Sequence, residues 1–261
     1  MGAGALHLGW GQPWLPLSAL VGCGLVGLVD DLINIRVHCL GVAGVRSSFK
    51  FIMITVLAVA LGWWFFKKID GADLLHIPFL GTIALGWFFV PLFAFAVVAT
   101  SNAVNISDGL DGLAGGLLST SYGAFGVIAL LQGQFMLAGF CFTVLGALLS
   151  YLWFNIYPAR FFMGDVGSFA FGTSLGVVAM LTNTLLLLPV IGILFVIEAG
   201  SSLIQITSKR FFHKKVFISA PIHHHLEAQG WPETKVTMRF WVISCVSAFL
   251  GVLLAFSGGL M

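Results

Sequence analysis

The sequence predicts an all-α membrane protein, a polytopic helical bundle of about eight transmembrane helices. Hydrophobic residues make up 59% of the 261-residue chain and charged residues only 8%, too few to cover the surface of a water-soluble protein. The apolar residues gather in long runs. An open sheet cannot cross lipid, and these runs are too long and too uniformly apolar for barrel strands, so helices remain.

Eight apolar runs are the predicted spans, and together they form one transmembrane domain over residues 1–261. The runs cover residues 15–29, 49–66, 79–100, 113–131, 135–154, 166–181, 185–206 and 236–256. The first and sixth are short for a crossing. The seventh contains Pro189 and then the polar stretch 198–202, so we expect its helix to be bent or interrupted.

The distribution of basic residues predicts the orientation. Eight crossings place the loops at 30–48, 101–112, 155–165 and 207–235 on one side of the membrane. Of the 12 Lys and Arg residues, ten lie on or beside that side, and only Lys67 and Lys68 lie opposite. The positive-inside rule makes the side with the ten basic residues cytoplasmic, and both termini then lie outside.

Acidic residues gather on the same side, where seven of the ten are found. A carboxylate at the end of an apolar helix needs water or a counter-charge. A solvated helix end explains any one of them, but five aspartates in three separate loops favour a functional site. Asp30 and Asp31 are adjacent and point in different directions on a helix. One can therefore face a metal or substrate while a neighbour holds the other.

The segment 102–112 is polar and rich in glycine between two predicted spans. If it is helical, its spacing of three residues places Asn105, Asp108 and Asp111 on one face. Such a face could hydrogen-bond a nucleobase or ribose, or hold a hydrated magnesium ion. An ordinary turn with helix caps is the alternative reading.

The next cytoplasmic loop carries Asn155, Arg160 and, after two phenylalanines, Asp165 between glycines. Asp165 is expected at the start of a helix, where it could serve as an N-cap. A carboxylate in this setting could equally bind a metal that carries phosphates, and Phe162 offers a stacking surface.

The last cytoplasmic loop contains three consecutive histidines, His223, His224 and His225. Three neighbours cannot comfortably ligate one ion, and a surface histidine cluster is normally solvated. Imidazoles that lie beside phosphates are the alternative. The chain has no His-Glu-x-x-His, Gly-x-Ser-x-Gly or Walker sequence, which argues against a zincin, a serine hydrolase and a P-loop NTPase.

Four of these segments, taken in order, resemble the motifs of the phospho-N-acetylmuramoyl-pentapeptide transferases. This family belongs to the polyprenyl-phosphate N-acetylhexosamine-1-phosphate transferase superfamily, of the glycosyltransferase family 4 type. The segments are Asp30-Asp31, 102–116, 155–168 and 220–231, and the resemblance covers nearly the whole chain. Pro-x-His-His-His followed by Gly-Trp-Pro is similar to the muramoyl-pentapeptide branch in particular.

The resemblance implies a magnesium-dependent enzyme of peptidoglycan synthesis in the bacterial inner membrane. Its substrates would be UDP-N-acetylmuramoyl-pentapeptide and undecaprenyl phosphate, its products lipid I and UMP, and its active site would face the cytoplasm. No nucleic acid partner is expected, and the resemblance leaves a homodimer open. Because the phosphate of a lipid acceptor lies at the interface, the site must lie at the cytoplasmic helix ends.

The resemblance also implies roles for individual residues. Asp30 would be the base that deprotonates the lipid phosphate, Asp31 would support it, and Asp165 would be the principal magnesium ligand. The remaining residues would contact the donor. Asn155 would lie near the metal and diphosphate, Asp108 and Asp111 would serve the nucleotide pocket together with Asn105, Phe162 would stack on uracil, and His223, His224 and His225 would contact the phosphates or sugar.

The chain also departs from the family pattern. Family members begin with two further transmembrane helices joined by a cytoplasmic loop, and this chain is expected to lack them. They usually carry a lysine four residues after the first aspartate, where this chain has Asn34, and the basic stretch that follows is represented by Arg46 and Lys50. A related N-acetylhexosamine-1-phosphate transferase, an inactive family member and a transporter with a bent helix around Glu198 are the alternatives.

Overall fold

A computed structural model describes residues 14–38, 47–68 and 74–259, with the backbone alone at 34–38 and 47–49. Arg46, predicted to be cytoplasmic, lies outside the described residues, as do the side chains of Asn34 and Arg36. The main helices are α1 (Trp14–His38), α2 (Ser47–Lys68), α3 (Phe89–Ser107), α4 (Leu113–Leu131), α5 (Phe135–Asn155), α6 (Gly164–Leu181), α7 (Leu188–Ile191), α8 (Ile193–Phe212), α9 (Ile222–Ala228) and α10 (Glu233–Ser257).

The all-α membrane fold is confirmed. Within the described residues, seven helices are long and apolar enough to cross a membrane, and a bent pair makes an eighth candidate span. Each predicted apolar run corresponds to one of these candidates. The first span is longer than its apolar run, because α1 continues past Asp30 and Asp31 to His38.

The predicted break in the seventh span is present near Pro189. The helices α7 and α8 meet at Gly192 with an angle of 83° between them. The polar stretch 198–202, the other ground for expecting a bent or interrupted helix, lies inside α8. There Ser201 donates its hydroxyl hydrogen to the carbonyl of Glu198 (2.9 Å), so this polar group is satisfied within the helix.

A small antiparallel hairpin was not predicted. Its strands β1 (Leu74–Ile77) and β2 (Gly81–Ala84) pair with Leu74 opposite Ala84, and the short 3-10 helix η1 (Gly86–Phe88) leads into α3. The third apolar run was expected to be helical from residue 79. Positive φ angles at Gly81 (102°) and Gly86 (54°) prevent this, and the candidate span begins only at Gly86.

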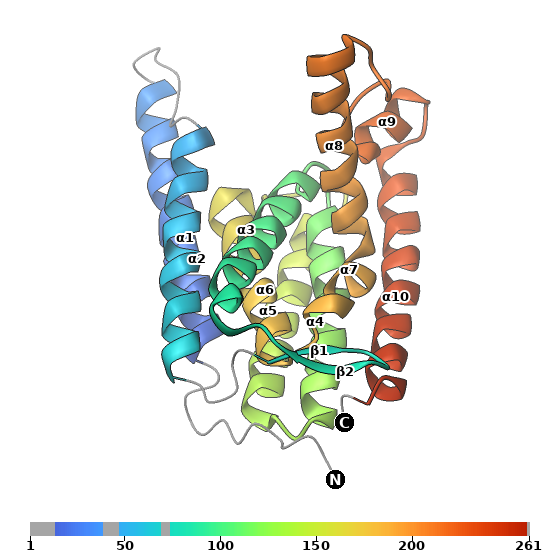
Figure 1. Cartoon of the computed structure of the whole chain (residues 1–261). Helices are drawn as coiled ribbons and strands as arrows, with labels where there is room; N and C mark the ends of the chain where they lie inside the picture. Colours follow the sequence, from blue (N-terminus) through green and yellow to red (C-terminus); the bar gives the residue numbers. More distant parts are fainter. Residues whose placement is uncertain (1–13, 39–46, 69–73, 260–261) are drawn as a thin grey trace.

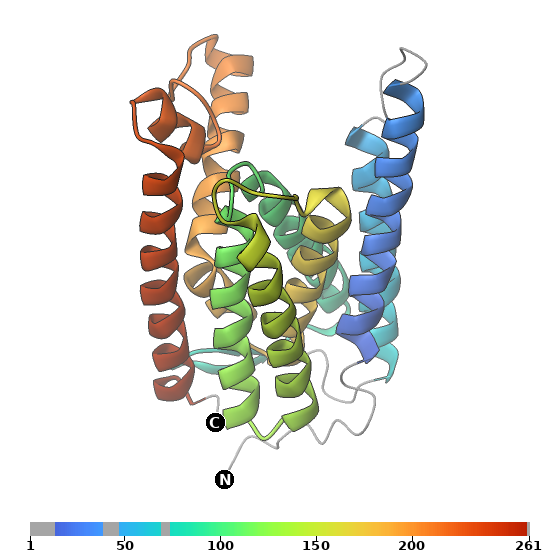
Figure 2. The ribbon, with the colours of Figure 1, turned by 180° about the vertical axis from the view of Figure 1, so that it is seen from behind.

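The bundle is built around α3, α4 and α6, whose surfaces are mostly buried. Helices α1 and α2 flank this centre on one side, α8 and α10 lie on the other, and α5 packs along α4 (Figures 1 and 2). The outer helices expose large apolar side chains along their length. Such an exposed surface suits contact with lipid.

The polar segments lie at one end of the bundle, which we call the polar end. It comprises the loops 108–112, 156–163 and 213–221 with the helix ends beside them, whereas the hairpin lies at the opposite end (Figure 1). This grouping agrees with the sidedness expected from eight crossings. It brings the predicted site segments to the same face of the molecule.

Close helix contacts bring α1 and α3 against α6. A Cβ added to Gly27 would lie 2.5 Å from the carbonyl oxygen of Asp165, and one added to Gly172 would lie 2.8 Å from the Cα of Ser101. Only glycine permits such an approach, as is common where membrane helices pack closely. Asp30 and Asp31 follow Gly27 by three and four residues, so they share its face of α1 and meet the start of α6.

We predict that Gly27→Ala lowers the thermal unfolding midpoint of the purified protein in detergent. Alanine favours the helix itself, but its methyl group would overlap the α6 backbone, a strain that typically costs about 1–3 kcal/mol. Gly24→Ala is the matched control, because its Cβ would meet Ala170 at an ordinary 3.6 Å. Equal midpoints for the two variants would show that the contact at Gly27 does not constrain α1.

Candidate functional site

The amino-terminal end of α6 is where the predicted site residues converge. The first backbone N–H groups of a helix lack partners within the helix. Here Asp31 of α1 accepts the N–H of Val166, and Asp108, which follows α3, accepts the N–H of Gly164. Two carboxylates from other helices therefore cap α6, and its dipole favours their negative charge.

Asp165 lies in the first turn of α6 and is not its N-cap, since Met163 holds that position. The expected capping role is therefore taken by Asp31 and Asp108. The carboxylate of Asp165 is instead turned to other partners. Its Oδ1 accepts a hydrogen bond from Nδ2 of Asn105 (2.8 Å), and its Oδ2 pairs with Nζ of Lys50 (2.6 Å).

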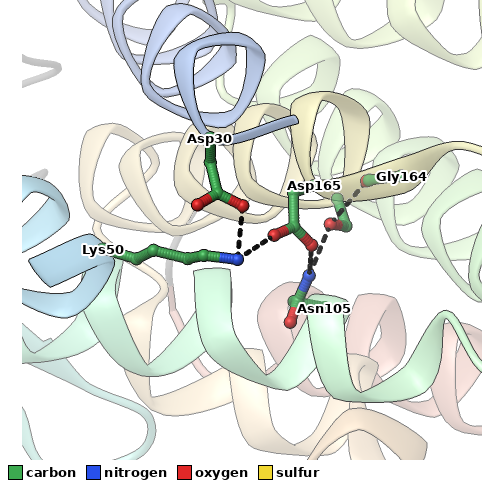
Figure 3. Close-up of polar contacts among 6 residues, drawn as sticks. Asp30, Lys50, Asn105, Gly164 and Asp165 are labelled. Carbon is green, nitrogen blue, oxygen red and sulfur yellow. Dashed lines mark hydrogen bonds and ion pairs between the residues drawn. The ribbon is translucent and has the colours of Figure 1, made fainter. Parts of the chain in front are cut away.

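Lys50 joins this group to Asp30. Its Nζ lies 2.5 Å from Oδ2 of Asp30, which is only 3% exposed, and so it bridges carboxylates of α1 and α6 (Figure 3). Asn105 is fixed in turn, because its Nδ2 also donates to Oγ of Ser168 (2.9 Å). The contacts hold α1, α2, α3 and α6 together at the polar end.

Three carboxylates of this cluster have the geometry of a metal site. Asp30, Asp31 and Asp165 each offer one oxygen, and these oxygens lie within 4.8 Å of one another. With the ammonium of Lys50 the group carries a formal charge of −2, which one divalent cation neutralises. Magnesium takes oxygen ligands and is commonly held by one or two carboxylates and substrate phosphates, so the residues fit this ion.

The raised pKa of Asp108 indicates an excess of negative charge in this region. Burial and, to a lesser extent, the nearby carboxylate of Asp165 together raise the pKa of its carboxyl to about 6, while the hydrogen bond from the Gly164 N–H acts in the opposite direction. A cation at Asp165 would relieve the repulsion between these two groups.

Two other predicted residues, Asp111 and Asn155, lie apart from the carboxylate cluster in contacts of their own. Helix α3 ends at Ser107, so the segment is not helical as far as Asp111, and Asp111 does not share a helical face with Asn105. Its Oδ2 accepts the N–H of Ala159 (2.9 Å).

Asn155 is buried; its Oδ1 accepts the N–H of Gly112 (3.0 Å), and its Nδ2 donates to the carbonyl of Phe161 (2.9 Å). These contacts fix the two loops, and the predicted substrate contacts remain untested.

Phe162 is available for stacking, as it is 68% exposed at the polar end. Its neighbour Phe161 packs on the rings of Tyr151 and Phe154 with centroids 5.4 and 6.0 Å apart. The loop is therefore anchored through Phe161 and presents Phe162. Its stacking on uracil stays a prediction.

The three histidines of α9 have three different surroundings. His223 is buried, and its Nδ1 lies 2.8 Å from Oε2 of Glu198. His224 pairs at the surface with Glu227 (2.7 Å). His225 accepts the N–H of Ile218 at Nδ1 (3.2 Å), and its Nε2 lies 3.0 Å from Nε2 of Gln229. The predicted contacts with phosphates or sugar are untested for all three.

Lys50 was counted among the cytoplasmic basic residues but was not predicted to be part of the site. Its sequence signal was a lysine at the very start of an apolar span, where a charge needs a counter-charge. The family pattern places a lysine at the position of Asn34 instead. The carboxylates of Asp30 and Asp165 lie 20 and 115 residues from Lys50 along the chain, so only the fold identifies them as its partners.

Comparison with known proteins places this geometry in a family. The model of glycosyl transferase family 4 matches residues 14–183. The chain is 42% identical over 253 residues to the phospho-N-acetylmuramoyl-pentapeptide-transferase of Chloroflexus aurantiacus, covering 92% of this chain and 69% of the relative. It is 41% identical over 242 residues to that of Geobacillus thermodenitrificans, covering 92% and 73%. The matched region holds the carboxylate cluster, and the extent of these matches shows that the chain belongs to glycosyl transferase family 4, among relatives of the phospho-N-acetylmuramoyl-pentapeptide-transferases.

Proposed function

We propose that this protein transfers phospho-N-acetylmuramoyl-pentapeptide from its UDP carrier to undecaprenyl phosphate, forming lipid I and UMP. The observation that carries the proposal is the meeting of Asp30, Asp31 and Asp165 with Lys50 at the polar end of a membrane bundle. The relatives' names supply the substrate class. The polar end would face the cytoplasm of a bacterial inner membrane, because most of the basic residues lie there.

The cluster suits phosphoryl transfer between two anions. Such a reaction needs charge neutralisation and positioning more than covalent chemistry by the protein. Magnesium, held principally by Asp165, would neutralise the diphosphate and the leaving UMP. Lys50 adds a positive charge between Asp30 and Asp165, and this charge weakens the repulsion between the two carboxylates.

Asp30 is the proposed proton acceptor. It would take the remaining proton from the phosphate of undecaprenyl phosphate, whose oxygen then attacks the phosphorus that carries the sugar through a bridging oxygen. A new phosphorus–oxygen bond forms there, and the bond to the oxygen of UMP breaks. In the structure one oxygen of Asp30 pairs with Lys50, so the ammonium can also attract the incoming phosphate to this carboxylate.

The donor would lie over the loops beside α6. Asp108 and Asn105 border the cluster, and the exposed ring of Phe162 lies in the loop that precedes α6. These groups can hydrogen-bond and stack with a uridine, while the diphosphate is directed to Asp165. Asp111, Asn155 and the histidines of α9 would shape or contact the rest of this pocket.

The purified protein, reconstituted with undecaprenyl phosphate and UDP-N-acetylmuramoyl-pentapeptide, should release UMP and form lipid I when magnesium is added. Asp165→Asn keeps the side-chain shape but removes a charge of the metal site, so activity should fall by orders of magnitude while folding is retained. Glu227→Gln removes the charge of a partly exposed carboxylate at the same end, outside the carboxylate cluster, and serves as the control. Near-normal turnover in Asp165→Asn would exclude Asp165 as the principal ligand.

Asp30→Asn tests the proposed base. A general base typically contributes about 100- to 10,000-fold, so the turnover number should fall within that range. Donor binding should persist, as it depends mainly on other loops. A phosphate monoester loses its second proton near pH 6, so raising the pH supplies more deprotonated acceptor and should partly restore turnover. Loss of donor binding without rescue at high pH would instead assign Asp30 a structural or metal-organising role.

A further inference from the structure

A buried acid–imidazole pair links α8 to α9 outside the carboxylate cluster. Glu198 and His223 have side chains that are 0% and 1% exposed, and Oε2 of Glu198 lies 2.8 Å from Nδ1 of His223. Among the described residues, Oε1 of Glu198 and Nε2 of His223 have no hydrogen-bond partner. Burying a polar group costs free energy unless the group is hydrogen-bonded. This pair leaves two of its four polar side-chain atoms without a partner, so stabilisation of the fold does not by itself account for it.

The unpartnered nitrogen of His223 is directed at the turn that follows α3. A Cβ added to Gly109 would overlap Nε2 of His223, and the ring's Cε1 would lie only 2.9 Å away. Gly109 is the next residue after Asp108, whose carboxylate accepts the N–H of Gly164 at the start of α6. The imidazole therefore supports the turn that carries Asp108.

Glu198 fixes how this ring is held. Its carboxylate accepts the hydrogen on Nδ1, which orients the imidazole and leaves Nε2 facing the turn. The same arrangement of an acid behind a histidine orients rings at other functional sites. A chain of contacts thus runs from Glu198 in α8, through His223 in α9, to the Asp108–Gly109 turn.

We propose that Glu198 is a positioning residue that acts through His223 on the Asp108–Gly109 turn and thereby shapes the binding site for the uridine diphosphate part of the donor. This inference rests on the proposed function. It assigns Glu198 no contact with substrate and no part in proton transfer. The buried carboxylate is then explained by the site it organises, without a transport pathway through the bundle.

The neighbouring pair of His224 and Glu227 provides a matched contrast. It has the same chemistry and a similar distance of 2.7 Å, but the two side chains are 44% and 32% exposed and lie three residues apart on one helix. A partly exposed surface pair of this kind contributes little. Replacing Glu227 therefore measures the effect of losing a histidine–acid contact that is not connected to the Asp108–Gly109 turn.

The test compares Glu198→Ala, Glu198→Gln and Glu227→Ala in the 261-residue chain. Loss of a buried hydrogen bond to a charged group should raise KM for UDP-N-acetylmuramoyl-pentapeptide by about tenfold or more in Glu198→Ala. KM for undecaprenyl phosphate should stay unchanged. Glutamine can still accept the Nδ1 hydrogen, so Glu198→Gln should stay within about threefold of wild type, as should Glu227→Ala.

A double-mutant cycle with Gly109→Ala tests the route. Gly109 has no positive φ, so alanine fits its backbone, and the three nearest atoms that the added Cβ would meet all belong to His223. If Glu198 works through this contact, the effects of Glu198→Ala and Gly109→Ala on donor KM should be markedly non-additive, whereas Glu227→Ala should add independently. If Glu198→Ala does not fold, Gly109→Ala must by itself raise donor KM.

A purely structural role of Glu198 predicts a different result, namely a lower turnover number or less folded protein in Glu198→Ala with an unchanged donor KM. That result would overturn the proposal. A readout independent of turnover is the nitrogen NMR signal of His223 in histidine-labelled protein, assigned with His223→Gln. Glu198→Ala should abolish the hydrogen-bonded Nδ1–H signal, and Glu227→Ala should preserve it. Its persistence in Glu198→Ala would refute the pairing even if the wild-type protein made no lipid I.

Discussion

The concentration of negative charge at the start of α6 is the constraint on which the polar end of this protein depends. Three carboxylate oxygens lie within 4.8 Å of one another. At an effective dielectric constant near 20, each pair of unit charges at 4 Å repels by about 4 kcal/mol. Lys50, the dipole of α6 and the amide of Asn105 oppose this repulsion. The remaining excess charge makes the cluster receptive to a divalent cation.

Close helix packing is what allows these charges to meet. Burial of apolar surface provides little driving force between helices in lipid, so contact depends on shape and on small residues. Gly27 lets α1 approach the backbone of α6, and Gly172 does the same between α6 and α3. The carboxylates of Asp31 and Asp108 then cap α6 from its two neighbours. Packing within the bundle and electrostatics at its end are therefore parts of one arrangement.

The broken seventh span connects the other side of the bundle to the same place. Helix α8 begins after the bend at Gly192 and carries Glu198, which is fully buried against His223 of α9. His223 in turn contacts the turn after Asp108 through Gly109. Helices α1 and α8, which lie on opposite sides in Figure 1, thus act on the same end of α6. Helix α1 does so through its aspartates, and α8 does so through Glu198 and His223 of α9. This explains how a polar side chain deep in a span can serve a site at the membrane surface.

Features that depend on composition and local pattern were determined by the sequence alone. The long apolar runs gave the helical spans, because backbone groups in lipid must be satisfied within a helix, and Pro189 marked the bend in the seventh. The motif residues Asp30, Asp31, Asn105, Asp108 and Asp165 were correctly grouped at one end. Local rules failed at the hairpin of residues 74–84, where Gly81 with its positive φ begins the second strand inside a run expected to be helical.

Contacts between distant segments were decided only by the tertiary structure. Lys50 appeared as one cation among many until the fold placed it between Asp30 and Asp165. Asp111 matched the spacing of Asn105 and Asp108, yet α3 ends before it and its carboxylate turns to Ala159. Three identical histidines acquired three different surroundings. Spacing along a chain fixes which residues can share a helix face, but which charges become neighbours depends on how the helices pack.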